Sequence, residues 1–263
     1  MNNKIKSILA VLVIISMIIP AMAVGNANSN KAQNVIGGVE IAPGVFYLGQ
    51  SMDKGQVIEG YAFVHYAKDS NEVKKSKPVW DDTVDTYKLM YGGIKWANTM
   101  TYEVNFEGSI LNQEVVKSTL QTSLETWDSK TSFSLFGPPI TLEEELTPGS
   151  LDYRNIVVWR NLAEIYGANV IAVNSFWFNP ATKEILDSDV TFSTNFEWSL
   201  SGESGKMDLQ NIATHEFGHN GLKDLYTVKT TELTMYGYSD YGETKKQDLG
   251  TGDISGIQAL YGE

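Results

Sequence analysis

The sequence predicts an α+β fold in which helices pack on a mixed, twisted sheet. Two observations support this prediction. Short β-branched and aromatic runs alternate with turn residues, and other segments carry apolar residues at helical spacing. The 263 residues are 42% hydrophobic and 20% charged, which is enough apolar material for a folded domain with a core.

The first residues are predicted to form a signal peptide. Two lysines precede the apolar run Ile8–Ile19, and the run is followed by Ala21-Met22-Ala23, a small-x-small pattern. The run is about a dozen residues long, short of the roughly 20 needed to span a bilayer. We therefore expect removal of residues 1–23, export of the mature chain and no stable membrane insertion. An uncleaved membrane anchor is the alternative.

Charge and cysteine content limit the possible partners and ligands. The net charge of −12 argues against nucleic acid as a partner, because phosphate binding needs a basic surface. The sequence has no cysteine. A zinc site would therefore take histidine and carboxylate ligands, and latency through a blocking cysteine is excluded.

Residues 24–88 are predicted to form a β-rich N-terminal segment. Val45–Leu48 and Tyr61–Tyr66 are β-branched or aromatic runs between Gly, Pro and Asp residues. Residues 69–88 begin with a charged, turn-like stretch, which we interpret as a linker to a main domain over 89–263. The segment is expected to be either a removed propeptide or an accessory β subdomain.

The main domain is predicted to alternate between strands and helices. The expected strands are Met100–Phe106, Thr131–Phe136, Asn155–Trp159 and a hairpin of Val170–Phe178 with Ile185–Phe192. The expected helices are Asn112–Asp128, Asp208 to about Asn220, and Asp253–Tyr261. Asp208 has the chemistry of an N-cap. This order of elements is typical of a mixed sheet that carries helices.

The main chemical feature is the segment His215–His219, which has the spacing His-Glu-x-x-His. On a helix, positions i and i+4 share one face, so both imidazoles can point at one ion. Glu216 is then placed to act on a water bound to that ion. The motif predicts a zinc hydrolase with His215 and His219 as ligands and Glu216 as the general base.

A catalytic zinc usually has three protein ligands, and the third must come from a histidine or a carboxylate. Gly221 permits the turn with positive φ that ends a helix, so the chain can fold back and present Asp224. Asp224 is therefore the nearest candidate. His65 lies far upstream in an alternating strand, where we expect a half-buried strand residue rather than a ligand. Glu243 is the third ligand in an alternative, gluzincin-type site.

Several segments resemble one peptidase family. His215–Asp224 resembles the metzincin zinc signature, in which His-Glu-x-x-His is followed by x-x-Gly-x-x and then His or Asp. Leu233–Tyr236 resembles the Met-turn of matrixins, and Gly252–Gly262 resembles their closing helix. The likeness covers about Tyr91–Gly262. It implies a metzincin-like (zincin) fold with an active-site helix and a C-terminal helix, one catalytic Zn²⁺, and protein or peptide substrates; it places no Ca²⁺ site.

The zinc signature departs from the family pattern by one residue. Gly221 stands two positions after His219 instead of three, and Asp224 stands five positions after it instead of six. For Asp224 to reach the ion, the loop must tighten or the helix must end earlier.

The sequence thus predicts a secreted zinc endopeptidase. Hydrolysis is expected to use a zinc-bound water, with Glu216 as base and His215, His219 and Asp224 as ligands. An extended substrate is expected to pair with an edge strand around Val170–Val173. Two alternatives stay open, which are a gluzincin-type hydrolase and a catalytically weak or inactive binding protein that kept the metzincin fold.

Overall fold

The computed structural model describes residues 37–68 and 83–263, which belong to one compact unit, Gln33–Glu263. The expected signal peptide lies outside the described residues, as do residues 69–82 of the expected linker. Within the two described ranges, no helix has the length and apolar character needed to cross a bilayer.

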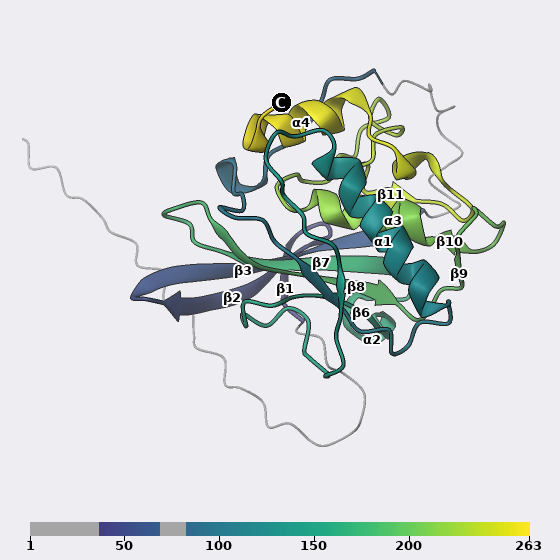
Figure 1. Cartoon of the computed structure of the whole chain (residues 1–263), viewed down its shortest axis with the longest axis horizontal. Coiled ribbons are helices and arrows are strands. Elements are labelled where there is room, and N and C mark those ends of the chain that lie inside the picture. The colour runs from purple at the N-terminus through teal and green to yellow at the C-terminus, as the bar shows by residue number, and fades with distance from the viewer. Residues whose placement is uncertain (1–36, 69–82) are drawn as a thin grey trace, which may run out of the picture. The chain divides into compact units, whose positions relative to one another are not determined.

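A mixed nine-stranded sheet organises the fold, with strand order β1-β2-β3-β7-β8-β6-β4-β5 and with β11 paired to β3 (Figure 1). Its strands are β1 Val39–Ala42, β2 Val45–Asp53, β3 Gln56–Ala67, β4 Tyr102–Val104, β5 Ile140–Thr141, β6 Asn155–Arg160, β7 Val170–Phe178, β8 Ile185–Ser193 and β11 Tyr238–Ser239. A separate small sheet pairs β9, Trp198–Ser199, with β10, Met207–Asp208. The predicted α+β class is confirmed.

The predicted strand Thr131–Phe136 is wrong. It makes only one isolated bridge, between Phe136 and Met100. The Asp128 carboxylate accepts hydrogen bonds from the backbone N–H groups of Leu135, at 2.5 Å, and Phe136, at 3.1 Å. These donors are therefore not available to a strand ladder, and the segment follows an irregular path.

The helices begin close to the predicted positions. They are α1 Gln113–Asp128, α2 Ala163–Tyr166, α3 Leu209–Gly218 and α4 Thr251–Tyr261, with 3₁₀ turns η2 Met90–Gly92 and η3 Lys245–Gln247. Asp208 caps α3 as predicted, since its carboxylate accepts from the backbone N–H of Asn211 at 2.9 Å. The first turn of the histidine helix is therefore fixed by its own sequence.

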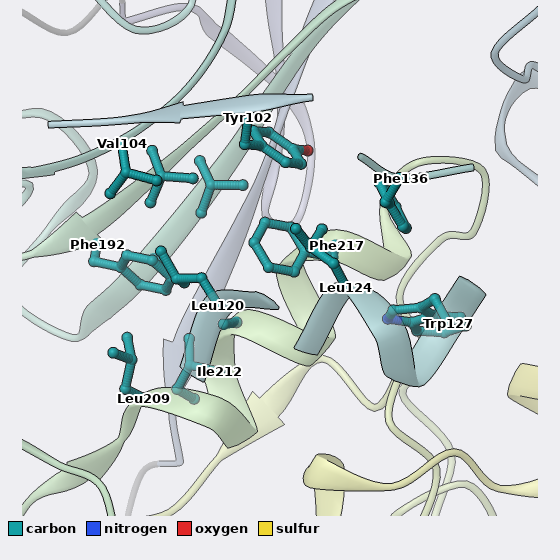
Figure 2. Packing of buried hydrophobic residues seen from close by; sticks show 14 of the residues in the cluster. Tyr102, Val104, Leu120, Leu124, Trp127, Phe136, Phe192, Leu209, Ile212 and Phe217 are labelled. Atoms are coloured by element: carbon teal, nitrogen blue, oxygen red, sulfur yellow. The ribbon is translucent and has the colours of Figure 1, made fainter. Parts of the chain in front are cut away.

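Helices α1 and α3 lie on the same side of the sheet (Figure 1) and pack closely on each other. Figure 2 shows Phe217 of α3 between Leu124 of α1 and Tyr102 of β4, whose ring centroid lies 4.9 Å from that of Phe217. Trp127 of α1 donates from Nε1 to the carbonyl of Thr214 at 2.7 Å. These contacts fix the position of α3 relative to the sheet.

The N-terminal strands extend the same sheet. Strand β3 is antiparallel to β7, and its residues Val64 and Tyr66 pair with Val173 and Val170. Strand β8 pairs with β7 on its other side. The expectation of an open edge at Val170–Val173 is therefore wrong, because β3 already uses the hydrogen-bonding groups of that edge. The division of the chain at residue 88 stays a prediction.

Candidate metal centre

Helix α3 carries His215, its C-cap residue is His219, and two carbonyl groups orient the two imidazoles. His215 Nδ1 lies 2.6 Å from the oxygen of Thr234, and His219 Nδ1 lies 2.9 Å from the oxygen of Leu222. Because a carbonyl oxygen only accepts, each Nδ1 carries the proton and each Nε2 keeps a lone pair. Burial lowers the pKa of His215 to about 4, so its imidazole is neutral at physiological pH.

The turn after α3 is tighter than a continued α-helix. The helix ends at Gly218, earlier than the predicted end near Asn220. The N–H groups of His219 and Asn220 each donate at 3.2 Å to the carbonyl three residues earlier. Such i→i+3 bonds tighten the last turn of a helix. The early end and the tightened turn together compensate for the residue missing from the zinc signature.

Asn220 anchors this turn to the rest of the domain. Its side-chain oxygen accepts from Trp96 Nε1 at 2.7 Å, and its Nδ2 donates to the hydroxyl of Tyr102 at 3.0 Å. The predicted left-handed conformation of Gly221 is wrong, since its φ is not positive. A Cβ atom there would lie 2.3 Å from Cδ1 of Leu260, so the Leu260 side chain packs directly on the backbone of this turn.

This turn brings Asp224 to both histidines. Its Oδ1 lies 3.1 Å from His215 Nε2 and 3.7 Å from His219 Nε2. Ligand atoms of a tetrahedral zinc with bonds of 2.0–2.1 Å are about 3.3 Å apart. Burial raises the pKa of Asp224, whereas the positive charges of protonated His219 and His215 and of Lys246 bring it below its ordinary value. The carboxylate is therefore ionised and has the charge of a metal ligand.

The unpaired atoms at this point indicate a cation. His215 Nε2 and Asp224 Oδ1 are buried and have no hydrogen-bond partner among the residues that the structure describes. Both are acceptors when His215 is neutral, so their approach to 3.1 Å is unfavourable without a positive charge between them. The three side chains therefore fit a zinc ion.

Glu216 is buried beside these ligands and is held by His65. Its Oε1 lies 3.1 Å from His65 Nδ1, while its Oε2 has no partner among the described residues. His65 Nε2 lies 3.0 Å from Ser239 Oγ and 3.4 Å from Lys246 Nζ. Because the lysine ammonium only donates, Nε2 accepts and Nδ1 donates to Glu216. The prediction that His65 is half-buried is wrong, since only 1% of its surface is exposed, and its contact with Glu216 was not foreseen.

Lys246 is a second site neighbour that the sequence analysis missed. Its Nζ donates to the carbonyl oxygens of Tyr236 and, at 2.8 Å, Tyr238, so it holds the end of the Met-turn and the residues that follow it. Burial lowers the pKa of Lys246 to about 8. No local pattern separates Lys246 from Lys245. For His65, the alternation of side chains along strand β3 could have indicated that it shares a face with Phe63.

Glu243 does not join the metal-binding cluster. Its Oε1 lies 3.4 Å from both Ser239 Oγ and Asn211 Nδ2. Among the described residues, two groups have the donor atoms for a metal: His65 with His215 and Glu216, and His215 with His219 and Asp224. His65 and Glu216 bond to each other, so the second group is the better metal site. The gluzincin-type arrangement has no support in this geometry.

The Met-turn lies against α3 and is tied to α4. A Cβ atom at Gly218 would lie 2.2 Å from Sδ of Met235, so the sulfur packs directly on the helix backbone. The buried carboxylate of Asp253 accepts from the N–H groups of Thr234 at 2.7 Å, Met235 at 3.1 Å and Gly250 at 3.0 Å. Asp253 therefore joins the C-terminal helix to the floor of the site.

The Asp253→Ala variant is expected to be less stable than wild type by about 3 kcal/mol or more, because it leaves three buried N–H groups without an acceptor. Urea denaturation monitored by tryptophan fluorescence measures this difference. Asp240→Ala, at an exposed position of the same region, is the control. A loss for Asp253→Ala no larger than the control's would show that Asp253 does not hold the Met-turn.

The fold and the site define a zincin-type domain with a His-Glu-x-x-His helix, a nearby aspartate and a methionine turn. Residues 164–262 match the family model described as Matrixin. The interstitial collagenase of Equus caballus is 25% identical over 185 residues, which cover 68% of this chain and 35% of that protein. The metalloendoproteinase 2-MMP of Arabidopsis thaliana is 25% identical over 189 residues, which cover 68% of this chain and 46% of that protein.

The matches thus span less than half of the length of these relatives. Together with the family model, they support a matrixin-like domain with a metzincin fold in this chain. The resemblance expected from the zinc signature, the Met-turn and the C-terminal segment is confirmed. The family suggests a metallopeptidase.

Proposed function

We propose that the protein is a secreted zinc-dependent endopeptidase with one catalytic zinc. The observation that carries this proposal is the pair of facing acceptors, His215 Nε2 and Asp224 Oδ1, with His219 Nε2 beside them. Two imidazoles and one carboxylate suit zinc and leave a position for water or substrate. The matrixin-like domain, and relatives named as a collagenase and a metalloendoproteinase, support a protein or peptide substrate.

Glu216 has the position of a general base in this proposal. Zinc, when bound, would acidify a water molecule and polarise the substrate carbonyl. Oε2 of Glu216 is the free oxygen of a carboxylate whose Oε1 is held by His65. It would take the proton of the attacking water and deliver it to the leaving amine. Burial raises the pKa of Glu216, which suits a group that carries a proton between two partners.

Secretion rests on the sequence of residues 1–23, with cleavage expected after Ala23. The acidic net charge argues against a nucleic acid as the partner. The inactive binding protein stays as the alternative function, and it would bind zinc without cleaving peptides.

Removal of the metal is expected to abolish hydrolysis. The purified protein should contain about one zinc per chain, measured by plasma mass spectrometry. Cleavage of fluorescent casein should stop with 1,10-phenanthroline and return with added zinc. A protein without zinc would refute the metal site. A protein with one zinc that cleaves neither casein nor a peptide library would favour the inactive binding protein.

A further inference from the structure

The two carboxylate oxygens of Asp224 have different partners. Oδ1 lies 3.1 Å from His215 Nε2 and has no hydrogen-bond partner among the residues of 37–68 and 83–263. Oδ2 lies 3.2 Å from the hydroxyl oxygen of Tyr226. A tyrosine hydroxyl keeps its proton at neutral pH and an ionised carboxylate only accepts, so Tyr226 is the donor. One oxygen is therefore available to the proposed ion, while the other is held by a side chain.

The backbone next to Tyr226 is bonded to the Met-turn. Leu225, the residue before it, donates from its N–H to the carbonyl of Met235 at 2.8 Å. The carbonyl of Leu225 accepts from the N–H of Gly237 at 3.0 Å. The start of the Tyr226 side chain therefore has a fixed position relative to the floor of the site.

The ring of Tyr226 is also fixed, although 43% of the residue is exposed. A Cβ atom at Gly237 would lie 2.4 Å from Cε1 of this ring, so the ring packs directly on the backbone there. Tyr238 contacts the ring edge-on, with centroids 5.4 Å apart and an interplanar angle of 68°. The hydroxyl is therefore held next to Oδ2 by the packing of its own ring.

The hydrogen bond to Oδ2 affects how Asp224 can bind a metal. A carboxylate binds an ion through one oxygen or through both. A catalytic zinc has three protein ligands and keeps a fourth position for water. If both oxygens of Asp224 bound the ion, the second oxygen would take the position that hydrolysis needs for water. The bond from Tyr226 opposes this, because Oδ2 would have to give up its donor.

We propose that Tyr226 is a positioning residue that limits Asp224 to one oxygen on the metal and so keeps the position for water open. This inference rests on the proposed function, because it concerns the same metal site. The two histidine ligands receive support of the same kind, since a backbone carbonyl holds the Nδ1 of each imidazole. Each of the three proposed ligands thus has a partner that orients it.

The Tyr226→Phe variant of the full chain tests the inference, because it removes the hydroxyl and keeps the ring. Competition with a fluorescent chelator measures zinc affinity. We expect Tyr226→Phe to bind zinc about tenfold more weakly than wild type, as is typical when a ligand loses its orienting partner. Tyr241→Phe is the matched control, since Tyr241 is 50% exposed and its ring pairs with Phe196. An affinity equal to that of the control would overturn the inference.

Cobalt(II) in place of zinc reports the number of ligands. Four-coordinate cobalt absorbs visible light more strongly than cobalt with five or six ligands, so we expect the absorption per bound cobalt to fall at least about twofold in Tyr226→Phe. A site that is only destabilised would bind less metal with the same spectrum per ion. An unchanged spectrum would therefore overturn the inference even where the affinity falls.

A double-mutant cycle tests whether Tyr226 acts through Asp224. In the Asp224→Ala background the hydroxyl has no carboxylate to hold. Tyr226→Phe should then change zinc affinity by less than about twofold. A loss as large as in the wild-type background would show that Tyr226 acts on the site in another way, which would overturn the inference.

Gly237→Ala displaces the ring of Tyr226 and keeps its hydroxyl. The added Cβ would lie 2.4 Å from Cε1, so the ring must move. The φ of Gly237 is not positive, so alanine fits the backbone there. We expect this variant to reproduce both effects of Tyr226→Phe and to add little when the two are combined. Wild-type affinity and a wild-type spectrum for Gly237→Ala would count against the inference.

Failure of the inference and failure of the proposed function give different results. If wild type binds zinc and cleaves casein, and Tyr226→Phe has the same affinity and spectrum, only the inference is overturned. If both readouts change in Tyr226→Phe but no chain cleaves casein, the role of Tyr226 is supported and the peptidase is refuted. A wild-type chain that binds no zinc refutes both.

Discussion

Replacement of Glu216 by glutamine is expected to lower casein hydrolysis by about 10³-fold while leaving zinc bound, because a positioned base contributes roughly 10²–10⁴-fold to such a reaction. Glutamine keeps the size of the side chain, and its oxygen can still accept from His65 Nδ1, which lies 3.1 Å from Oε1 in the wild type. The amide cannot take a proton from water. The variant therefore removes the base and keeps the packing around it.

The measurement compares casein hydrolysis by the Glu216→Gln variant with hydrolysis by wild type at equal zinc content. Glu232→Gln is the matched control, since Glu232 is also buried but bonds to Thr231 and Lys245 instead of the metal centre. Zinc content is measured on the same samples. Full hydrolysis by Glu216→Gln would refute Glu216 as the base, even if the metal site is intact.

The local parts of the site could be predicted from the sequence. The spacing of His215 and His219 places both on one face of a helix, and Asp208 marks where that helix begins. The helical spacing of apolar residues likewise predicted α1. Trp127 of α1 fixes α3 through a hydrogen bond from its Nε1 to the carbonyl of Thr214. These features depend on residues close in sequence, so their periods are visible in the chain itself.

The remaining parts depend on contacts between distant segments. The reach of Asp224 follows from the anchoring of Asn220 by Trp96 and Tyr102, which no local pattern encodes. In the same way, the alternation of β3 indicates a strand but not its neighbours. Only the pairing with β7 and β11 reveals that His65 meets Glu216.

Replacement of Asp224 by alanine is expected to weaken zinc binding by more than about 100-fold, beyond the 10–100-fold typical of residues that only orient a ligand. Asp224 supplies the negative charge of the three-residue cluster, and its Oδ1 faces both imidazoles at 3.1 and 3.7 Å. Two neutral histidines alone leave zinc with more open positions than a catalytic site has. Hydrolysis should fall with the zinc content, and competition with a fluorescent chelator measures the affinity.

Two further variants identify the ligand. Asp224→Asn keeps the shape and an oxygen that can accept from the Tyr226 hydroxyl, which lies 3.2 Å from Oδ2 in the wild type, so it isolates the loss of charge. Glu243→Gln removes the carboxylate that a gluzincin-type site would use, and we expect it to bind zinc as wild type does. If Asp224→Ala binds zinc as tightly as wild type while Glu243→Gln loses it, Glu243 is the third ligand. In that case the tightened turn after His219 would stabilise the fold without positioning a metal ligand.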